Sequence, residues 1–276
     1  MSSATTTSAA TATPTTSAGL APWLEALHAG SGRLAALVGD LSEADLSRPS
    51  FADGWSIAQV LSHLGSAAEI SAGLLQRGLA GDTTGVRRED VAPVWERWNA
   101  LSAPAQREAW TKADARHLAL LDSLDERTRA EARVPYFAGL LDVPAYAGYR
   151  LSEQSVHAWD IEAALHTAAT IPPAEVRLLW ERLDLVATRF RDGDTLRRLA
   201  PRQLSVHLTD PERTLLLDLG GELHLYPCEP AEPAGALAGP AEAVLRMVYG
   251  RSRPADGITV TGSVTLADLQ GLFPGF

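Results

Sequence analysis

The sequence predicts an α+β chain of two domains, in which a helical bundle precedes a small α+β domain with an antiparallel sheet. Up to about residue 195, apolar side chains recur at helical spacing between capping and proline signals. Beyond that point, short apolar runs alternate with turn residues. The chain has 276 residues and 46% hydrophobic content, enough for two cores. We therefore predict a helical domain at 20–195 and a second domain at 196–276.

The first helix is expected over residues 21–41, where Trp and Leu residues recur at helical spacing. Gly30 and Gly32 lower the helix propensity within it. The preceding Ser/Thr/Ala-rich segment, 1–19, has neither the basic nor the apolar region of a signal peptide. We predict that this segment is a disordered tail.

The second helix is expected to begin after Ser56, because Ser56 and Gln59 form the S-x-x-Q pattern of a capping box. His63 follows two turns into this helix and adjoins an apolar stripe that would face the bundle interior. The residues of the stripe are Ile57, Val60, Leu61 and Leu64.

The remaining helices of the bundle are separated by proline-containing segments. We expect a long helical stretch over 93–124 that is interrupted or kinked near Pro104, and then an irregular connection over 125–148. A helix over 153–165 follows, and a fifth over 173–191 leads out of the bundle. Four helices in this order indicate a bundle with one long crossover.

The second domain is expected to hold antiparallel strands with hairpin turns at Asp210-Pro211 and Gly220-Gly221. Its predicted elements are strands at 203–208, 214–219, 222–226 and 258–261, and helices at 241–249 and 266–272.

Glu153 and His157 are four residues apart, so on a helix they lie one turn apart on the same face. His63, from another helix, can supply a third ligand. Three N/O ligands leave one coordination position open, which is typical of a catalytic rather than a structural zinc site. The alternative for each histidine is a hydrogen-bonded core residue. The sequence therefore indicates a divalent metal site.

Charge and composition exclude several classes of function. A net charge of −10 and a pI near 5.2 argue against nucleic-acid binding. No apolar run approaches the ~18 residues of a membrane span. Cys228 is the only cysteine, so no intramolecular disulfide can form and a reactive thiol would come from outside. We expect a cytoplasmic protein without membrane or nucleic-acid partners, and take a monomer as the default.

Three stretches of the sequence carry a family resemblance. They are Gly54-Trp55-Ser56 with His63-Leu64-Gly65, the segment Glu153-Gln154-Ser155-Val156-His157-Ala158-Trp159-Asp160, and Tyr249-Gly250-Arg251. Together they resemble the mycothiol-dependent maleylpyruvate isomerase family, within the DinB-like superfamily of metal-binding four-helix bundles. The resemblance covers nearly all of the chain beyond residue 20. It implies a divalent metal, usually zinc, on His63, Glu153 and His157, and mycothiol as the thiol cofactor.

Two further residues are candidates for catalytic roles. The resemblance implies that Arg251 faces the cleft and receives a substrate carboxylate through a bidentate pair; the alternative is a surface or interdomain arginine. Asp160 follows His157 by three residues and is close enough on a helix to bond its ring. The alternative for Asp160 is a hydrogen bond to the first helix or a loop.

These observations lead to a functional hypothesis. We expect a metal-dependent enzyme that uses mycothiol to isomerise or S-conjugate a small electrophilic substrate, because a cation beside a thiol favours the nucleophilic thiolate. One alternative is a thiol-independent metal-dependent hydrolase, lyase or isomerase. Another is a non-catalytic protein that binds a small ligand.

Overall fold

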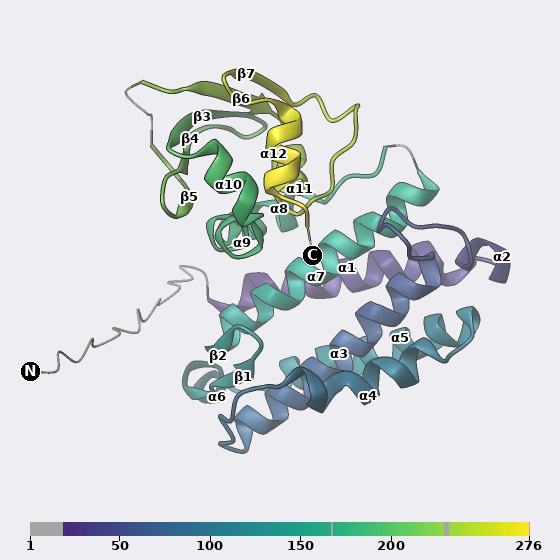
Figure 1. Ribbon diagram of the computed structural model, residues 1–276. Helices are drawn as coiled ribbons and strands as arrows, with labels where there is room; N and C mark the ends of the chain where they lie inside the picture. Colours follow the sequence, from purple (N-terminus) through teal and green to yellow (C-terminus); the bar gives the residue numbers. More distant parts are fainter. Residues whose placement is uncertain (1–18, 167, 229–231, 276) are drawn as a thin grey trace, which may run out of the picture.

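The computed structural model describes residues 19–166, 168–228 and 232–275, so the predicted tail lies outside the described residues except for Gly19. A four-helix bundle is followed by a sheet with its own helices, which confirms the predicted α+β class (Figure 1). The bundle helices are α1 (Leu20–Gly39), α3 (Ile57–Leu79), α5 (Ala103–Asp122) and α7 (Val143–Leu165). Shorter helices flank them: α2 (Glu43–Leu46), α4 (Arg88–Asn99) and α6 (Glu126–Glu131). In the described part of the chain, no helix combines the length and apolar character that crossing a membrane requires.

Side-chain caps fix where the two helices of the candidate site begin. Ser56 Oγ accepts a hydrogen bond from Gln59 N at 3.2 Å, and Gln59 Oε1 accepts one from Ser56 N at 2.8 Å. This reciprocal pair is the predicted capping box, and it starts α3 at Ile57. Helix α7 starts after Asp142, whose Oδ1 accepts from Ala145 N at 2.7 Å. The two caps therefore fix the residues at which the helices that carry His63, Glu153 and His157 begin.

Of the interruption or kink expected near Pro104 in the helical stretch over 93–124, the structure shows an interruption, because the chain forms α4 and α5 with a break at 100–102. Pro104 lies in the first turn of α5, the position that tolerates a proline ring without a helical hydrogen bond to lose. Its ring would clash with a carbonyl of a continuous helix, so a new helix starts there.

The irregular connection expected over 125–148 is more ordered than predicted. It contains α6 and a hairpin of β1 (Val134–Tyr136) and β2 (Gly139–Leu141), and α7 begins well before Glu153. The single helix expected over 173–191 is also wrong, since the chain forms α8 (Pro173–Trp180) and α9 (Leu183–Phe190).

The sheet has the strand order β5-β4-β3-β6-β7. Its strands are β3 (Arg202–Thr209), β4 (Glu212–Leu219), β5 (Leu223–Tyr226), β6 (Gly235–Gly239) and β7 (Thr259–Gly262). Three of the pairings are antiparallel, whereas β3 and β6 run parallel, so the sheet is mixed. Strand β6 was not predicted, because Gly-Ala-Leu-Ala-Gly has little β propensity. Gly235 fits there because a Cβ would collide with the carbonyl oxygen of Thr261 on β7.

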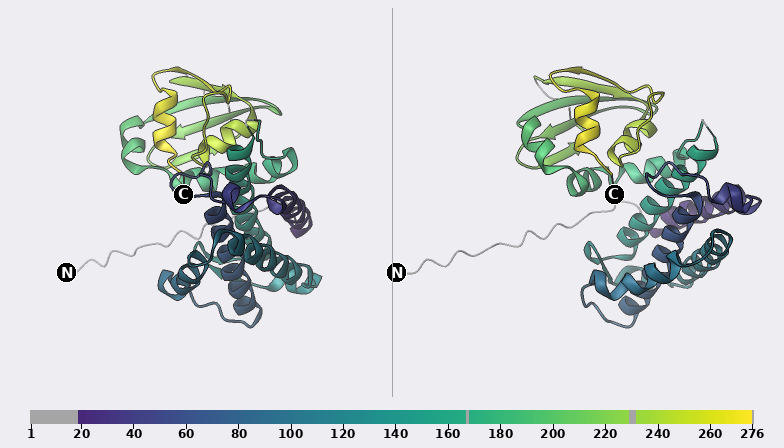
Figure 2. Two further views of the ribbon diagram at one scale, coloured as in Figure 1. Left: turned by 90° about the vertical axis from the view of Figure 1, so that its right-hand side faces the viewer. Right: turned by 45° about the vertical axis from the view of Figure 1, so that its right-hand side comes forward.

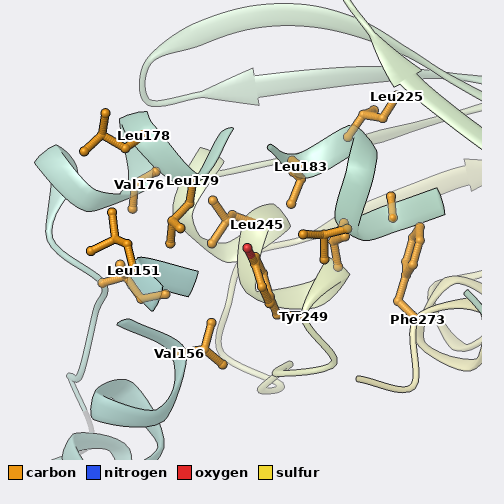
Figure 3. Packing of buried hydrophobic residues seen from close by; sticks show 14 of the residues in the cluster. Leu151, Val156, Val176, Leu178, Leu179, Leu183, Leu225, Leu245, Tyr249 and Phe273 are labelled. Atoms are coloured by element: carbon orange, nitrogen blue, oxygen red, sulfur yellow. The ribbon is translucent and has the colours of Figure 1, made fainter. Parts of the chain in front are cut away.

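Helices α8, α9 and α11 (Ala241–Val248) lie between the sheet and α7 (Figures 1 and 2). One apolar core runs through this interface, where side chains of α7 meet those of α8 and α11 (Figure 3). Its labelled members include Leu151, Val156, Leu178, Leu179, Leu245 and Tyr249. The helical and sheet-containing parts therefore share a core, which holds their relative position.

The predicted domain boundary at 195/196 falls inside α10 (Gly193–Leu199), which packs against α12 (Leu266–Leu272). Helix α9 also binds the sheet: Leu225 N donates to Asp184 Oδ1 at 2.7 Å, and Thr188 Oγ1 donates to Leu223 O at 2.7 Å. The boundary itself stays a prediction.

Gly65 of α3 provides a test of the bundle packing. A Cβ at this position would overlap the buried ring of Trp98 on α4 and lie 3.0 Å from Trp110 Cα on α5. We expect Gly65→Ala to lower the free energy of unfolding by about 1–3 kcal/mol through overpacking. Gly73→Ala on the same helix is the control, since its Cβ would meet no atom within 4 Å. That variant should gain up to about 1 kcal/mol from helix propensity. Urea denaturation measures both, and equal stability of the two variants would contradict this packing.

Candidate metal centre

Helices α3 and α7 bring His63, Glu153 and His157 together in the bundle. His63 Nε2 lies 3.0 Å from Glu153 Oε2, and His157 Nε2 lies 3.7 Å from the same oxygen. One ligand atom from each of the three residues lies within 4.8 Å of the others. The two imidazole rings meet edge to face with centroids 4.6 Å apart. The three residues singled out in the sequence thus form one cluster of convergent donor atoms.

The electrostatics of this cluster favour an ionised Glu153 and a neutral His157. Burial alone would raise the pKa of Glu153, but the hydrogen bond with His63 and the charges of His63, His157 and Arg150 lower it to about 2. Burial lowers the pKa of His157, which outweighs the opposing effect of its acidic neighbours. An ionised Glu153 and a neutral His157 are the forms in which these two side chains bind a metal.

His157 is oriented by Asp160, one of the two residues expected to have a catalytic role. The Nδ1 atom of His157 lies 2.9 Å from Asp160 Oδ2, and the Asp160 side chain is fully buried. Burial opposes ionisation of Asp160, but its bonds to His157 and Arg251 lower its pKa. An ionised Asp160 accepts a hydrogen bond from Nδ1–H of His157, which leaves Nε2 unprotonated on the side of the ring that faces Glu153.

Arg251, the other residue expected to have a catalytic role, binds the carboxylate of Asp160. Its Nε donates to Asp160 Oδ1 at 3.2 Å and its Nη2 donates to Oδ2 at 3.0 Å. Its Nη1 donates to the carbonyl oxygen of Tyr249 at 2.8 Å. Arg251, Asp160 and His157 therefore form a continuous buried chain that ends at the cluster.

A cavity of about 530 Å³ opens beside His157 and Arg251. Its volume is in the range of small-molecule sites. The other lining residues come from the loop before α3 and from two segments of the C-terminal part of the chain: Phe51, Ala52, Asp53, Trp55, Gly250, Pro274 and Gly275. The Arg251 guanidinium thus both binds Asp160 and lines this cavity.

Trp55 has a different environment from the one the sequence suggested. Its place before the capping box predicts a hydrophobic staple or core residue, yet the side chain is 37% exposed. Its ring lies 5.1 Å from the His63 ring and 6.0 Å from the His157 ring, centroid to centroid. Trp159 is buried against Phe51. The one local signal for Trp55 is its place immediately before Ser56, the N-cap of the helix that carries His63.

This chain is similar to proteins of known family and to solved structures. Residues 27–162 match the family model described as the mycothiol maleylpyruvate isomerase N-terminal domain. A crystal structure of a mycothiol-dependent maleylpyruvate isomerase superposes with a TM-score of 0.66 at 19% identity, covering 90% of this chain and 95% of that chain. A histidine-to-alanine mutant of such an isomerase gives a TM-score of 0.63 at 16% identity over the same shares. At these identities the structural likeness shows the fold. No curated protein matches the sequence significantly.

Proposed function

Since residues 27–162 belong to the mycothiol maleylpyruvate isomerase N-terminal domain family, we propose that this chain is a metal-dependent enzyme that uses a low-molecular-weight thiol. Its reaction is the isomerisation or S-conjugation of a small electrophile, and its thiol is mycothiol. The observation that carries the proposal is the convergence of His63, Glu153 and His157 on one point beside an open cavity.

The chemistry of the donor set fits a divalent cation such as zinc. Two imidazole nitrogens and one carboxylate form a common three-ligand set that leaves one coordination position open. Nδ1 of His157 is hydrogen-bonded to Asp160, so Nε2 is the ring atom that would bind the ion. The side chains of His63 and Glu153 are 29% and 24% exposed, and His157 lines the cavity, so a small molecule can reach the cluster.

A bound cation would favour the thiolate form of a thiol at neutral pH. Reversible addition of that thiol to an activated double bond gives isomerisation if the thiol leaves and an S-conjugate if it stays. In this proposal Asp160 holds the His157 ring, and Arg251 both holds Asp160 and presents its guanidinium to a substrate carboxylate. Trp55 and Phe51 supply an apolar wall for the substrate.

Turnover with and without thiol tests the proposal. Zinc-reconstituted protein is incubated with maleylpyruvate and with other small electrophiles, in the presence and absence of mycothiol. Isomerisation is followed by ultraviolet absorbance and S-conjugates by mass spectrometry. We expect turnover that requires the thiol and falls to background in His157→Ala, while His28→Ala, a change at an exposed histidine on α1, leaves it unchanged.

The same assay separates the rival functions. Metal-dependent turnover that ignores the thiol would replace the proposal with a thiol-independent hydrolase, lyase or isomerase. Ligand binding that persists in a metal-free Glu153→Ala/His157→Ala variant, without turnover of any substrate, would replace it with a binding protein.

A further inference from the structure

A second cavity, of about 420 Å³, lies between α8, the turn joining β3 to β4, and the start of α11. Figure 1 shows these elements on the sheet side of the molecule, beyond α7. The cavity shares no lining residue with the one beside His157. It is therefore a separate site, and nothing in the proposed chemistry of the metal centre requires it.

The floor of this cavity is apolar. Ile171, Val176, Leu208 and Ala241 line it, and each is at most 5% exposed. The partly buried ring of Trp180 forms one wall. An apolar floor of this size suits the body of a small ring-containing molecule.

The rim carries positive charge that the described residues do not neutralise. Arg177 and Arg213 are exposed and line the cavity. Neither guanidinium takes part in any hydrogen bond or ion pair described for residues 19–166, 168–228 and 232–275. Asp210 supplies one negative charge on the same rim, so the two arginines leave a surplus of positive charge.

The other acidic residue of the lining, Glu242, already accepts hydrogen bonds from Arg246 and from the backbone of Ile171. Its Oε1 accepts from Arg246 Nε at 2.6 Å and its Oε2 accepts from Arg246 Nη2 at 3.1 Å. Oε1 also accepts from the backbone N–H of Ile171 at 3.0 Å. Ala241, the first residue of α11, lines the cavity, and the N-cap Pro240 supplies no side-chain cap, so the positive end of this helix adds to the field.

We propose that this cavity binds a small monocarboxylic acid with an apolar ring. The ring lies on the floor beside Trp180, and the carboxylate pairs with Arg177 and Arg213. Charge complementarity selects this class of ligand, because a neutral molecule would gain no ion pair with either guanidinium and a cation would be repelled.

Calorimetric titration of the full chain with 2-naphthoate tests the proposal, with neutral 2-naphthamide as the charge control. We expect saturable binding of the acid and at least about tenfold weaker binding of the amide. Arg177→Ala and Arg213→Ala should each weaken naphthoate binding about tenfold, and the double variant should abolish it. Arg127→Ala, which removes an exposed arginine paired with Glu131, should leave it unchanged.

The outcome does not depend on the metal centre. Both arginines are exposed, so their variants should keep the wild-type melting temperature. Naphthoate binding should persist in His157→Ala. If wild type shows no saturable binding, or if binding is lost in His157→Ala but retained in the double arginine variant, the second site does not exist. Failure of thiol-dependent turnover, by contrast, would leave this site untouched.

Discussion

Replacing His157 by alanine is expected to reduce the metal content of the purified protein from about one ion per chain to nearly none. Among the residues that the structure describes, His157 supplies one of three converging donor groups, and its side chain is 4% exposed. Water could enter the space left by the imidazole, but the remaining His63 and Glu153 would hold a cation far more weakly. Elemental analysis after zinc reconstitution and desalting measures the change directly.

His63→Ala should cause the same loss, because His63 contributes the only ligand from α3. The matched control is His28→Ala, which removes an exposed imidazole paired with Asp122 and leaves the cluster intact. Its metal content should equal that of wild type. A folded, reconstituted wild type that retains no metal would overturn the assignment of these residues as ligands.

Asp160→Ala is expected to destabilise the metal-free protein by about 3–5 kcal/mol, because it breaks the buried ion pair between Asp160 and Arg251. The same change frees the His157 ring to rotate or change tautomer, so the affinity for zinc should fall by about 10- to 100-fold. Urea denaturation in the presence of a chelator gives the first quantity. Competition with a zinc-binding dye gives the second.

Two variants separate charge from shape in this prediction. Asp160→Asn keeps a hydrogen-bonding side chain of similar size, so it should cost less stability than Asp160→Ala while still weakening zinc binding. Asp53→Ala removes an exposed carboxylate that lines the cavity beside His157. Its free energy of unfolding should stay within about 0.5 kcal/mol of wild type. If Asp160→Ala were as mild as Asp53→Ala, the buried chain from Arg251 to His157 would have no structural role.

Local features of this protein could be predicted from the sequence because their causes lie within a few residues. Ser56 and Gln59 satisfy each other's backbone donors across three positions, and the start of α3 follows from that pair. Glu153 and His157 share a face because four residues make about one helical turn. The same locality explains why the sequence indicated an interruption or kink near Pro104, where α5 begins.

Contacts between elements were decided by the tertiary structure. Arg251 and Asp160 are 91 residues apart. No local signal in the sequence indicates that the guanidinium donates two hydrogen bonds to that carboxylate. Nor does periodicity show that Trp55 lies over two histidine rings, or that Gly235 pairs with a strand whose backbone leaves no room for a side chain. The sequence by itself determined the helical and sheet-forming halves, the main caps and the three candidate ligands. Packing determined which side chains meet across helices and loops, because that depends on shape and burial summed over the whole fold.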